Sequence, residues 1–157
     1  MSGQLSGGYF PIYPHHDDLP DPEIRTFITN FYRDSDRADR NELWISHFTQ
    51  DAQVVMGNDR GTGEQEIREL RSRMWTTVQE RQHSVFKVFP GRFGDQNSDS
   101  GDLNQECEFM LFGEVKLQTK LGQSLAVPWA GHAILKKGMY GEKEEWKFRH
   151  YQVWLQK

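Results

Sequence analysis

The sequence predicts a single α+β domain in which helices cover one face of an antiparallel sheet. Three observations lead to this fold class. Apart from one short strand, apolar residues follow the period of a helix between residues 21 and 78, and from residue 82 to 155 they follow the period of a strand. The chain has 157 residues, which suits one domain and leaves little for a second core. Aromatic residues make up 13% of the chain, enough bulky apolar mass to build that core.

The helices are predicted from capping residues and apolar stripes. The first begins at Asp21, a favoured N-cap residue, and its stripe recurs every three or four positions: Ile24, Phe27, Ile28, Phe31 and Tyr32. A shorter helix is expected over residues 41–47. A third is expected over residues 63–78, because Thr62 and Gln65 form a capping-box pattern before another apolar stripe.

The strands are predicted from alternation and from the turn residues between them. Residues 52–56 form a short strand that ends at Gly57. Residues 90–105 are a polar stretch rich in Gly, Asp, Ser and Asn, which predicts a long loop. Glycines near residues 121–122 and 138–142 predict consecutive hairpins among the longer strands, which are expected at 82–89, 106–117, 125–136 and 145–155.

Both faces of the late strands are largely apolar. Alternation predicts Trp129 and His132 on opposite faces of their strand. In the last strand it assigns one face to Trp146, Phe148, His150, Gln152 and Trp154, and the other to Tyr151, Val153 and Leu155. The helices can cover only one side of the sheet, so we expect a second copy of the chain on the other side, in a homodimer joined through the sheet.

Charge and composition exclude several classes of function. Lys and Arg number 19 against 23 Asp and Glu, a formal net charge of −4, so the basic face of a nucleic-acid binder is not expected. No apolar run approaches the roughly 18 residues of a membrane span, and we expect a cytoplasmic protein. One cysteine, Cys107, argues against a disulfide framework or a cysteine zinc site. The sequence has no Gly-rich phosphate loop and no His-Glu-x-x-His pair, so we expect neither the use of a nucleotide nor a catalytic metal.

Residues 1–20 contain glycines and prolines and follow no period, which predicts a flexible tail before a domain at 21–157. His15, His16, Asp17 and Asp18 include metal-ligand residue types. Ligands on such a tail lack an orienting second shell, so we expect a solvated arm there rather than a metal site.

Several short motifs carry a resemblance to a known family: Phe48-Thr49-x-Asp51-Ala52 at the first strand, Gly57, Gly63, Ile67-Arg68 and Met74-Trp75 after it, Gln82-His83-Ser84 at the next strand, and Glu145-Trp146-Lys147-Phe148 with Tyr151-Gln152-Val153 at the end. With the order of elements, they make residues 20–157 resemble the nuclear transport factor 2-like superfamily, and within it the SnoaL-like group. The chain is similar to small fungal SnoaL-like proteins, many encoded near secondary-metabolite pathways. The resemblance implies a cone-shaped fold and an apolar pocket between a curved sheet and about three helices.

The resemblance also implies a cofactor-independent isomerase, cyclase or dehydratase that acts on a small hydrophobic, polycyclic substrate by acid–base chemistry. His83 matches the histidine of scytalone dehydratase-type members, and His132, Glu114 and Arg37 are the other catalytic candidates. The candidate substrate-binding residues are Tyr32, Trp44, Met56, Phe112, Trp129, His150 and Trp154.

Two positions depart from the family pattern. Pro128 stands where relatives often carry an acidic residue, and Gly113 stands where the dehydratase group has a second histidine. The full dehydratase set is therefore absent. Three functions remain open at this point: an enzyme that uses its histidines, an enzyme in which aromatic walls direct a rearrangement by shape, and a binding or dimerisation module without turnover.

Overall fold

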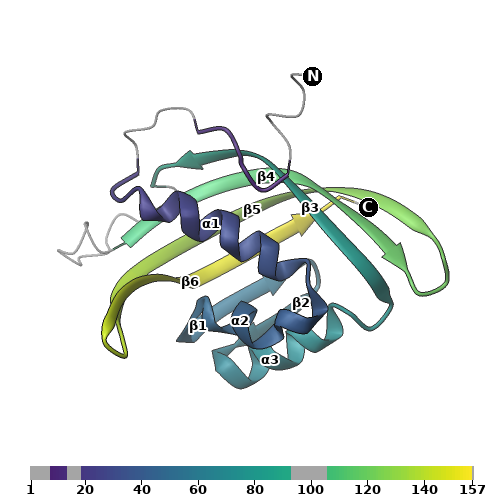
Figure 1. Cartoon of the computed structure of the whole chain (residues 1–157), viewed down its shortest axis with the longest axis horizontal. Coiled ribbons are helices and arrows are strands. Elements are labelled where there is room, and N and C mark those ends of the chain that lie inside the picture. Colours follow the sequence, from purple (N-terminus) through teal and green to yellow (C-terminus); the bar gives the residue numbers. More distant parts are fainter. Residues whose placement is uncertain (1–7, 14–18, 93–105, 157) are drawn as a thin grey trace.

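A computed structural model describes residues 8–13, 19–92 and 106–156, and Figure 1 shows the arrangement of their helices and strands. The order of elements is α1 (Glu23–Ser35), the short 3-10 helix η2 (Ala38–Arg40), α2 (Asn41–Ser46), β1 (Phe48–Met56), β2 (Asp59–Thr62), α3 (Gly63–Arg73), β3 (Val78–Pro90), β4 (Glu106–Thr119), β5 (Ser124–Tyr140) and β6 (Lys143–Leu155). The α+β prediction is confirmed. In the part of the chain that the structure describes, no helix is both long and apolar enough to cross a membrane.

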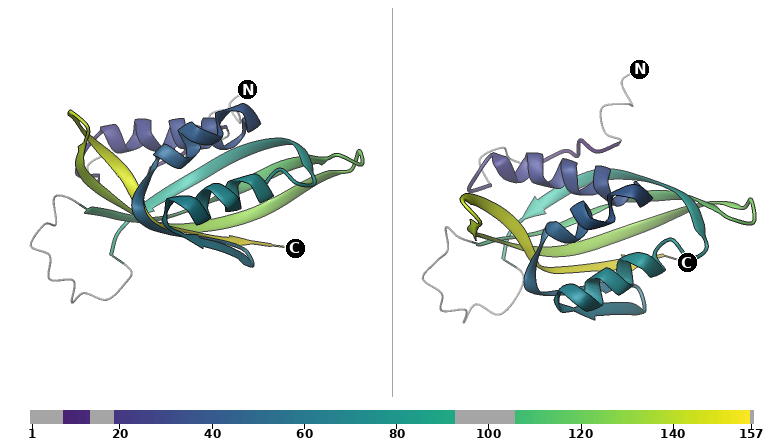
Figure 2. Two further views of the ribbon diagram at one scale, coloured as in Figure 1. Left: turned by 90° about the horizontal axis from the view of Figure 1, so that it is seen from below. Right: turned by 60° about the horizontal axis from the view of Figure 1, so that its bottom comes forward.

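The sheet is mixed rather than purely antiparallel. Its six strands run in the order β2-β1-β6-β5-β4-β3. Strands β3 to β6 form the consecutive antiparallel pairs that the sequence predicted, whereas β1 pairs with β6 in parallel. The sheet is strongly curved, and the helices lie together on its inner side (Figure 2).

The helices follow the predicted stripes with small changes at their ends. In α1, Ile24, Ile28, Phe31 and Tyr32 are buried, and the Asp21 carboxylate accepts the backbone N–H of Glu23. The predicted capping box at the start of α3 does not form. The side chain of Thr62 caps nothing, and the Glu66 carboxylate accepts the backbone N–H of Thr62 instead. Helix α3 ends at Arg73, and Val78 already begins β3.

A β-bulge in β6 overturns the predicted faces of the last strand. Ile134 pairs with His150 and Leu135 with Phe148, so Arg149 is an extra residue that the ladder skips. Alternation therefore changes phase at this point. Trp146, Phe148, Tyr151 and Val153 are all buried under the helices, whereas Trp154 is 47% exposed on the outer face. The sequence prediction that Trp146, Phe148 and Trp154 share a face is wrong for this reason.

Phe31 lies at the centre of the core. Its ring contacts those of Trp44, Phe48, Phe148 and Tyr151, with centroid distances of 4.7–5.8 Å. These rings come from α1, α2, β1 and β6, so aromatic packing joins the helical layer to the sheet.

Residues 8–13 lie along β3 rather than apart from the domain. Ile12 forms a parallel bridge with Lys87, and the backbone N–H of Val85 donates to the carbonyl of Gly8 at 2.8 Å. Tyr9 and Tyr13 pack against the core. The packed unit therefore begins before the predicted boundary at residue 20. The possible ligands His15 to Asp18 lie outside the described residues.

Candidate active site

A cavity of about 420 Å³ lies between the helices and the inner face of the sheet. Its walls are mostly apolar and include Trp44 from α2, Met56 from β1 and Trp129 from β5. Few polar side chains reach it, and His83 is one of them. Acid–base chemistry in such a cavity depends on a few polar groups, because burial shifts their pKa values.

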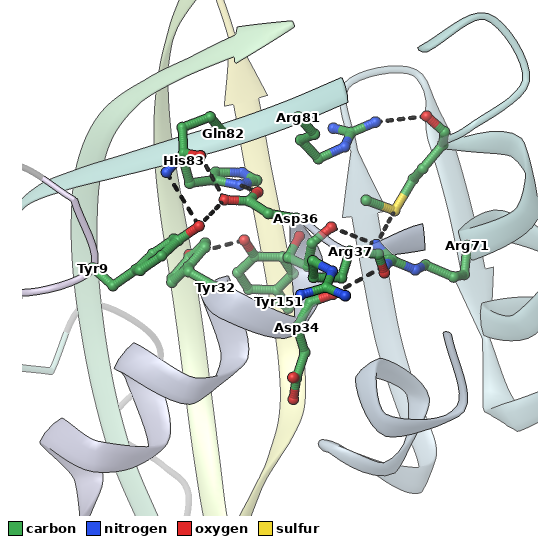
Figure 3. Close-up of polar contacts among 12 residues, drawn as sticks. Tyr9, Tyr32, Asp34, Asp36, Arg37, Arg71, Arg81, Gln82, His83 and Tyr151 are labelled. Atoms are coloured by element: carbon green, nitrogen blue, oxygen red, sulfur yellow. Dashed lines mark hydrogen bonds and ion pairs between the residues drawn. The ribbon is translucent and has the colours of Figure 1, made fainter. Parts of the chain in front are cut away.

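His83 is held by Asp36, 47 residues earlier in the chain. His83 lies on the inner face of β3, and Asp36 follows the last turn of α1. The imidazole Nδ1 is 2.6 Å from Asp36 Oδ1, and the backbone N–H of His83 donates to Asp36 Oδ2 at 2.8 Å (Figure 3). Because a carboxylate accepts at Nδ1, the neutral ring carries its proton there and leaves Nε2 as the basic atom.

Burial governs the protonation of His83. The side chain is 9% exposed, and burial lowers its pKa below the ordinary value of 6.5, against the opposing effect of Asp36. The imidazole is therefore neutral at physiological pH and able to accept a proton. Once it is protonated, the adjacent carboxylate stabilises the imidazolium.

Tyr9 adds a third hydrogen bond to the same carboxylate. Its hydroxyl donates to Asp36 Oδ2 at 2.5 Å, and Gln82 Nε2 donates to the hydroxyl at 3.2 Å (Figure 3). Burial and the contact with Asp36 raise the pKa of Tyr9 above its ordinary value, so the phenol remains a donor. The Tyr9 carbonyl in turn accepts from Thr29 Oγ1 on α1. Residues 8–13 thus help to orient the Asp36–His83 pair.

Arg71 fixes the turn that carries Asp36. This side chain on α3 is fully buried, and it donates to the carbonyl oxygens of Asp34, Ser35 and Arg37 at 2.8–3.1 Å. These carbonyls lie at the C-terminal end of α1, where backbone acceptors lack partners within the helix. The guanidinium therefore holds the backbone on both sides of Asp36.

The rings of Tyr32 and Trp129 pack against the imidazole of His83. The Tyr32 ring lies 5.1 Å from the imidazole and is stacked with Trp129 at 5.5 Å. Its hydroxyl shares a hydrogen bond of 2.9 Å with that of Tyr151, which lines the cavity. Burial raises the pKa of both tyrosines, which keeps them protonated.

Solved structures show what this arrangement is similar to, although no protein-family model matches the chain and no curated protein matches it significantly. A hexachlorocyclohexane dehydrochlorinase, LinA type 2, is 15% identical with a TM-score of 0.64, over 88% of this chain and 89% of that one. A putative scytalone dehydratase from Novosphingobium aromaticivorans is 12% identical with a TM-score of 0.63, over 85% and 82%. A nuclear transport factor 2-like protein from Salmonella enterica is 14% identical with a TM-score of 0.66, over 83% and 87%.

The chain has the nuclear transport factor 2-like fold. The matches extend over most of both chains, and the curved sheet with its inner helices is the shared architecture. At these identities the likeness is one of fold, so the roles of individual residues depend on the geometry of this chain.

The nuclear transport factor 2-like sheet separates the candidate residues into two groups. Tyr32, Trp44, Met56, His83 and Trp129 lie on its inner side, and all but Tyr32 line the cavity. His132 lies on the outer side, where its Nε2 is 2.5 Å from Glu108 Oε2 and its ring is 5.2 Å from that of His150. The other outward residues are Glu114, Phe112 and Trp154, which alternate with the inward positions of β4 and β6. The structure therefore does not bring this second group to the cavity.

Arg37 lies beside the cavity rather than in it. A wider depression of about 830 Å³ adjoins the cavity and shares four of its residues: Arg81, Leu117, Leu125 and Ala126. Arg37 lines this outer opening, and its exposed side chain pairs with Asp39 at 3.1 Å. Its backbone carbonyl accepts from Arg71, so the residue also belongs to the turn that positions Asp36.

The sequence patterns did not predict the roles of Asp36, Tyr9 and Arg81. A usable signal existed for Arg81, because it precedes His83 by two residues in one strand and must share its face. No local pattern links Asp36 to His83 or to Tyr9. Within the described ranges, no three His, Cys, Asp or Glu side chains gather where a metal ion could bind.

Proposed function

We propose that this protein is a cofactor-independent enzyme that moves a proton on a hydrophobic polycyclic substrate, with His83 as the base. The observation that carries the proposal is a neutral, buried imidazole at the wall of an apolar cavity, oriented by Asp36. General bases of this type contribute about 10²–10⁴-fold to a rate. Relatives of the fold whose names refer to dehydrochlorination and dehydration give the proposal a precedent.

The geometry favours a single group that both takes and returns the proton. His83 Nε2 accepts a proton from a carbon atom of the substrate, and Asp36 stabilises the imidazolium that forms. The proton then goes to another atom of the substrate, which gives an isomer, or to a leaving hydroxyl group, which gives dehydration. The aromatic walls of Trp44 and Trp129 hold the rings in place during both steps.

Exchange with heavy water tests this proposal without knowledge of the natural substrate. A panel of fused-ring ketones with an acidic C–H next to the carbonyl is incubated with the protein in D₂O, and deuterium uptake is followed by mass spectrometry. We expect catalysed exchange of at least one member, and a loss of about 10²-fold or more in His83→Gln and Asp36→Asn. His132→Gln is the matched control, because it makes the same change on the outer face and should leave the rate unchanged.

Two results would contradict the proposal. If the panel binds but exchanges no faster than in buffer, the domain is a binding module. If His83→Gln retains full exchange and Trp129→Ala abolishes it, the cavity acts by shape and not by a histidine base.

We also propose that the outer face of the sheet joins two copies of the chain. The exposed ring of Phe112 contacts those of Phe86 and Phe89, and the exposed Trp154 lies on the same side. Exposed apolar surface of this kind favours a partner over water. His132 and its partner Glu108 lie on this face, which gives them a place at the interface rather than at the active site.

A further inference from the structure

Arg81 places a positive charge in the wall that the cavity shares with its outer opening. Its side chain points to the inner face of β3, as that of His83 does. Figure 3 shows Arg81 beside His83 on the same strand. Nη2 donates to the carbonyl oxygen of Met74 at 2.6 Å, and the guanidinium lies 5.1 Å from the centroid of the Trp75 ring. These contacts fix the side chain at the entrance to the cavity.

The charge of Arg81 is only partly balanced within the described part of the chain. No carboxylate there forms an ion pair with it, and its buried Nε has no hydrogen-bond acceptor. The charge of Asp36 favours the cation, but burial outweighs this effect and lowers the pKa of Arg81. The neighbouring guanidinium of Arg71 is likewise disfavoured by burial and by Arg81. A partly buried cation without a directly paired counter-ion is costly to the folded protein, and an anion bound to it in the cavity reduces that cost.

We propose that the cavity binds an apolar ring compound that carries an anionic oxygen group, and that Arg81 binds this group. The inference rests on the proposed function only in using the same cavity as the binding site. It narrows the substrate class from hydrophobic compounds in general to those with an anionic oxygen, such as a carboxylate or phenolate. The anionic end then lies at the entrance, and the rings extend toward Trp129 and His83.

A matched pair of fluorescent probes tests the inference. 1-Anilinonaphthalene-8-sulfonate and N-phenyl-1-naphthylamine have the same ring system, and only the first carries an anionic oxygen group. We expect the folded protein to prefer the anionic probe, and Arg81→Met to reduce that preference about tenfold or more, because hydrogen bonds to charged groups are worth about 1.5–3 kcal/mol. Arg81→Lys keeps the charge and should restore part of the preference.

Lys116→Met is the control, because Lys116 lines the outer opening with an exposed side chain and its removal makes the same change in net charge. The preference should survive in this variant. Three results would overturn the inference: equal loss of both probes in Arg81→Met, an unchanged preference in Arg81→Met, or an equal loss of preference in Lys116→Met. Thermal unfolding of each variant confirms that it is folded.

The probe assay needs no turnover, so it separates this inference from the proposed function. Preference for the anion without deuterium exchange would overturn only the proposed enzyme activity. Exchange that depends on His83 without preference for the anion would overturn only the role of Arg81. His83→Gln should keep the preference for the anionic probe.

Discussion

Replacement of Arg71 by methionine tests whether one buried guanidinium holds the site together. Methionine retains much of the length of the side chain and removes every charged donor. Arg71 is fully buried, with Nε 2.6 Å from Asn41 Oδ1 and its terminal nitrogens bonded to the carbonyls of Asp34, Ser35 and Arg37. The variant removes all of these charged donors. The carbonyls of Asp34 and Arg37 keep the backbone N–H groups of Arg37 and Arg40 as partners, so what they lose is the hydrogen bond from the guanidinium.

The expected loss of stability follows from these contacts. Each hydrogen bond from a charged donor contributes about 1.5–3 kcal/mol, which gives roughly 6 kcal/mol for the three bonds to the carbonyls of the turn. Part of this loss is offset because the cation is itself disfavoured in the fold. Its pKa is lowered from 12.5 to about 10, mainly by burial, and such a shift corresponds to about 3 kcal/mol at 1.36 kcal/mol per pKa unit. We therefore expect Arg71→Met to lower the free energy of unfolding by about 3 kcal/mol.

Urea unfolding followed by tryptophan fluorescence measures this loss. Arg73→Met is the matched control on the same helix, because the Arg73 side chain is 48% exposed and pairs with Asp59 at the surface. We expect a loss below about 1 kcal/mol there. Arg71→Lys keeps the charge with fewer donors and should fall between the two. If Arg71→Met and Arg73→Met lose the same small amount, the carbonyls do not depend on Arg71.

Four further predictions concern the acid–base pair and the outer face. Because burial lowers the pKa of His83 below 6.5, deuterium exchange should remain constant as pH falls from about 8 past 6.5 and decline only through the lower pKa of the folded state. The free energy of unfolding should also decrease as the pH falls below about 6.5, because the unfolded chain binds this proton at a higher pH than the folded chain does. Urea unfolding should show a smaller decrease below pH 6.5 in His83→Gln than in the wild type. Tyr9→Phe keeps the ring but removes the hydroxyl that donates to Asp36, and it should slow exchange about tenfold in rate assays with a stability loss within about 1.5 kcal/mol; an unchanged rate would mean that residues 8–13 do not orient the pair. Phe112→Glu should convert dimers to monomers in sedimentation experiments, whereas the same change at Leu121, 91% exposed at a hairpin, should have no effect; a wild-type chain that sediments as a monomer would contradict the dimer.

Local patterns predicted most of the fold. The stripe of α1 is buried as expected, and the antiparallel order of β3 to β6 follows from the turns between them. The error in β6 has a physical cause. The bulge at Arg149 depends on how β6 pairs with Ile134 and Leu135 of β5, and no alternation within β6 alone records it. A shift of one residue moves every later side chain to the other face, which places Tyr151 inside and Trp154 outside.

The candidate site was less predictable, because its contacts join distant parts of the chain. His83 could be named from its motif, but its partner Asp36 lies 47 residues away, and the sequence pointed to the neighbouring Arg37 in that charged loop instead. Tyr9 belongs to a segment without periodicity, and only its docking along β3 brings its hydroxyl to Asp36. Tertiary structure, rather than spacing, assembles the pair.

Trp129 and His132 lie on opposite faces of β5, as alternation predicted. Trp129 is buried beside Tyr32 and His83, whereas His132 lies on the outer side with Glu108. Gly113 has no room for a side chain. A Cβ atom there would overlap the carbonyl oxygen of Ser84 and lie 3.1 Å from the Trp129 ring, so a second histidine does not fit at this position. In the proposed function, His83 is therefore the base and Trp129 a wall of the same cavity, and the exchange rates of His83→Gln and Trp129→Ala measure how much each contributes.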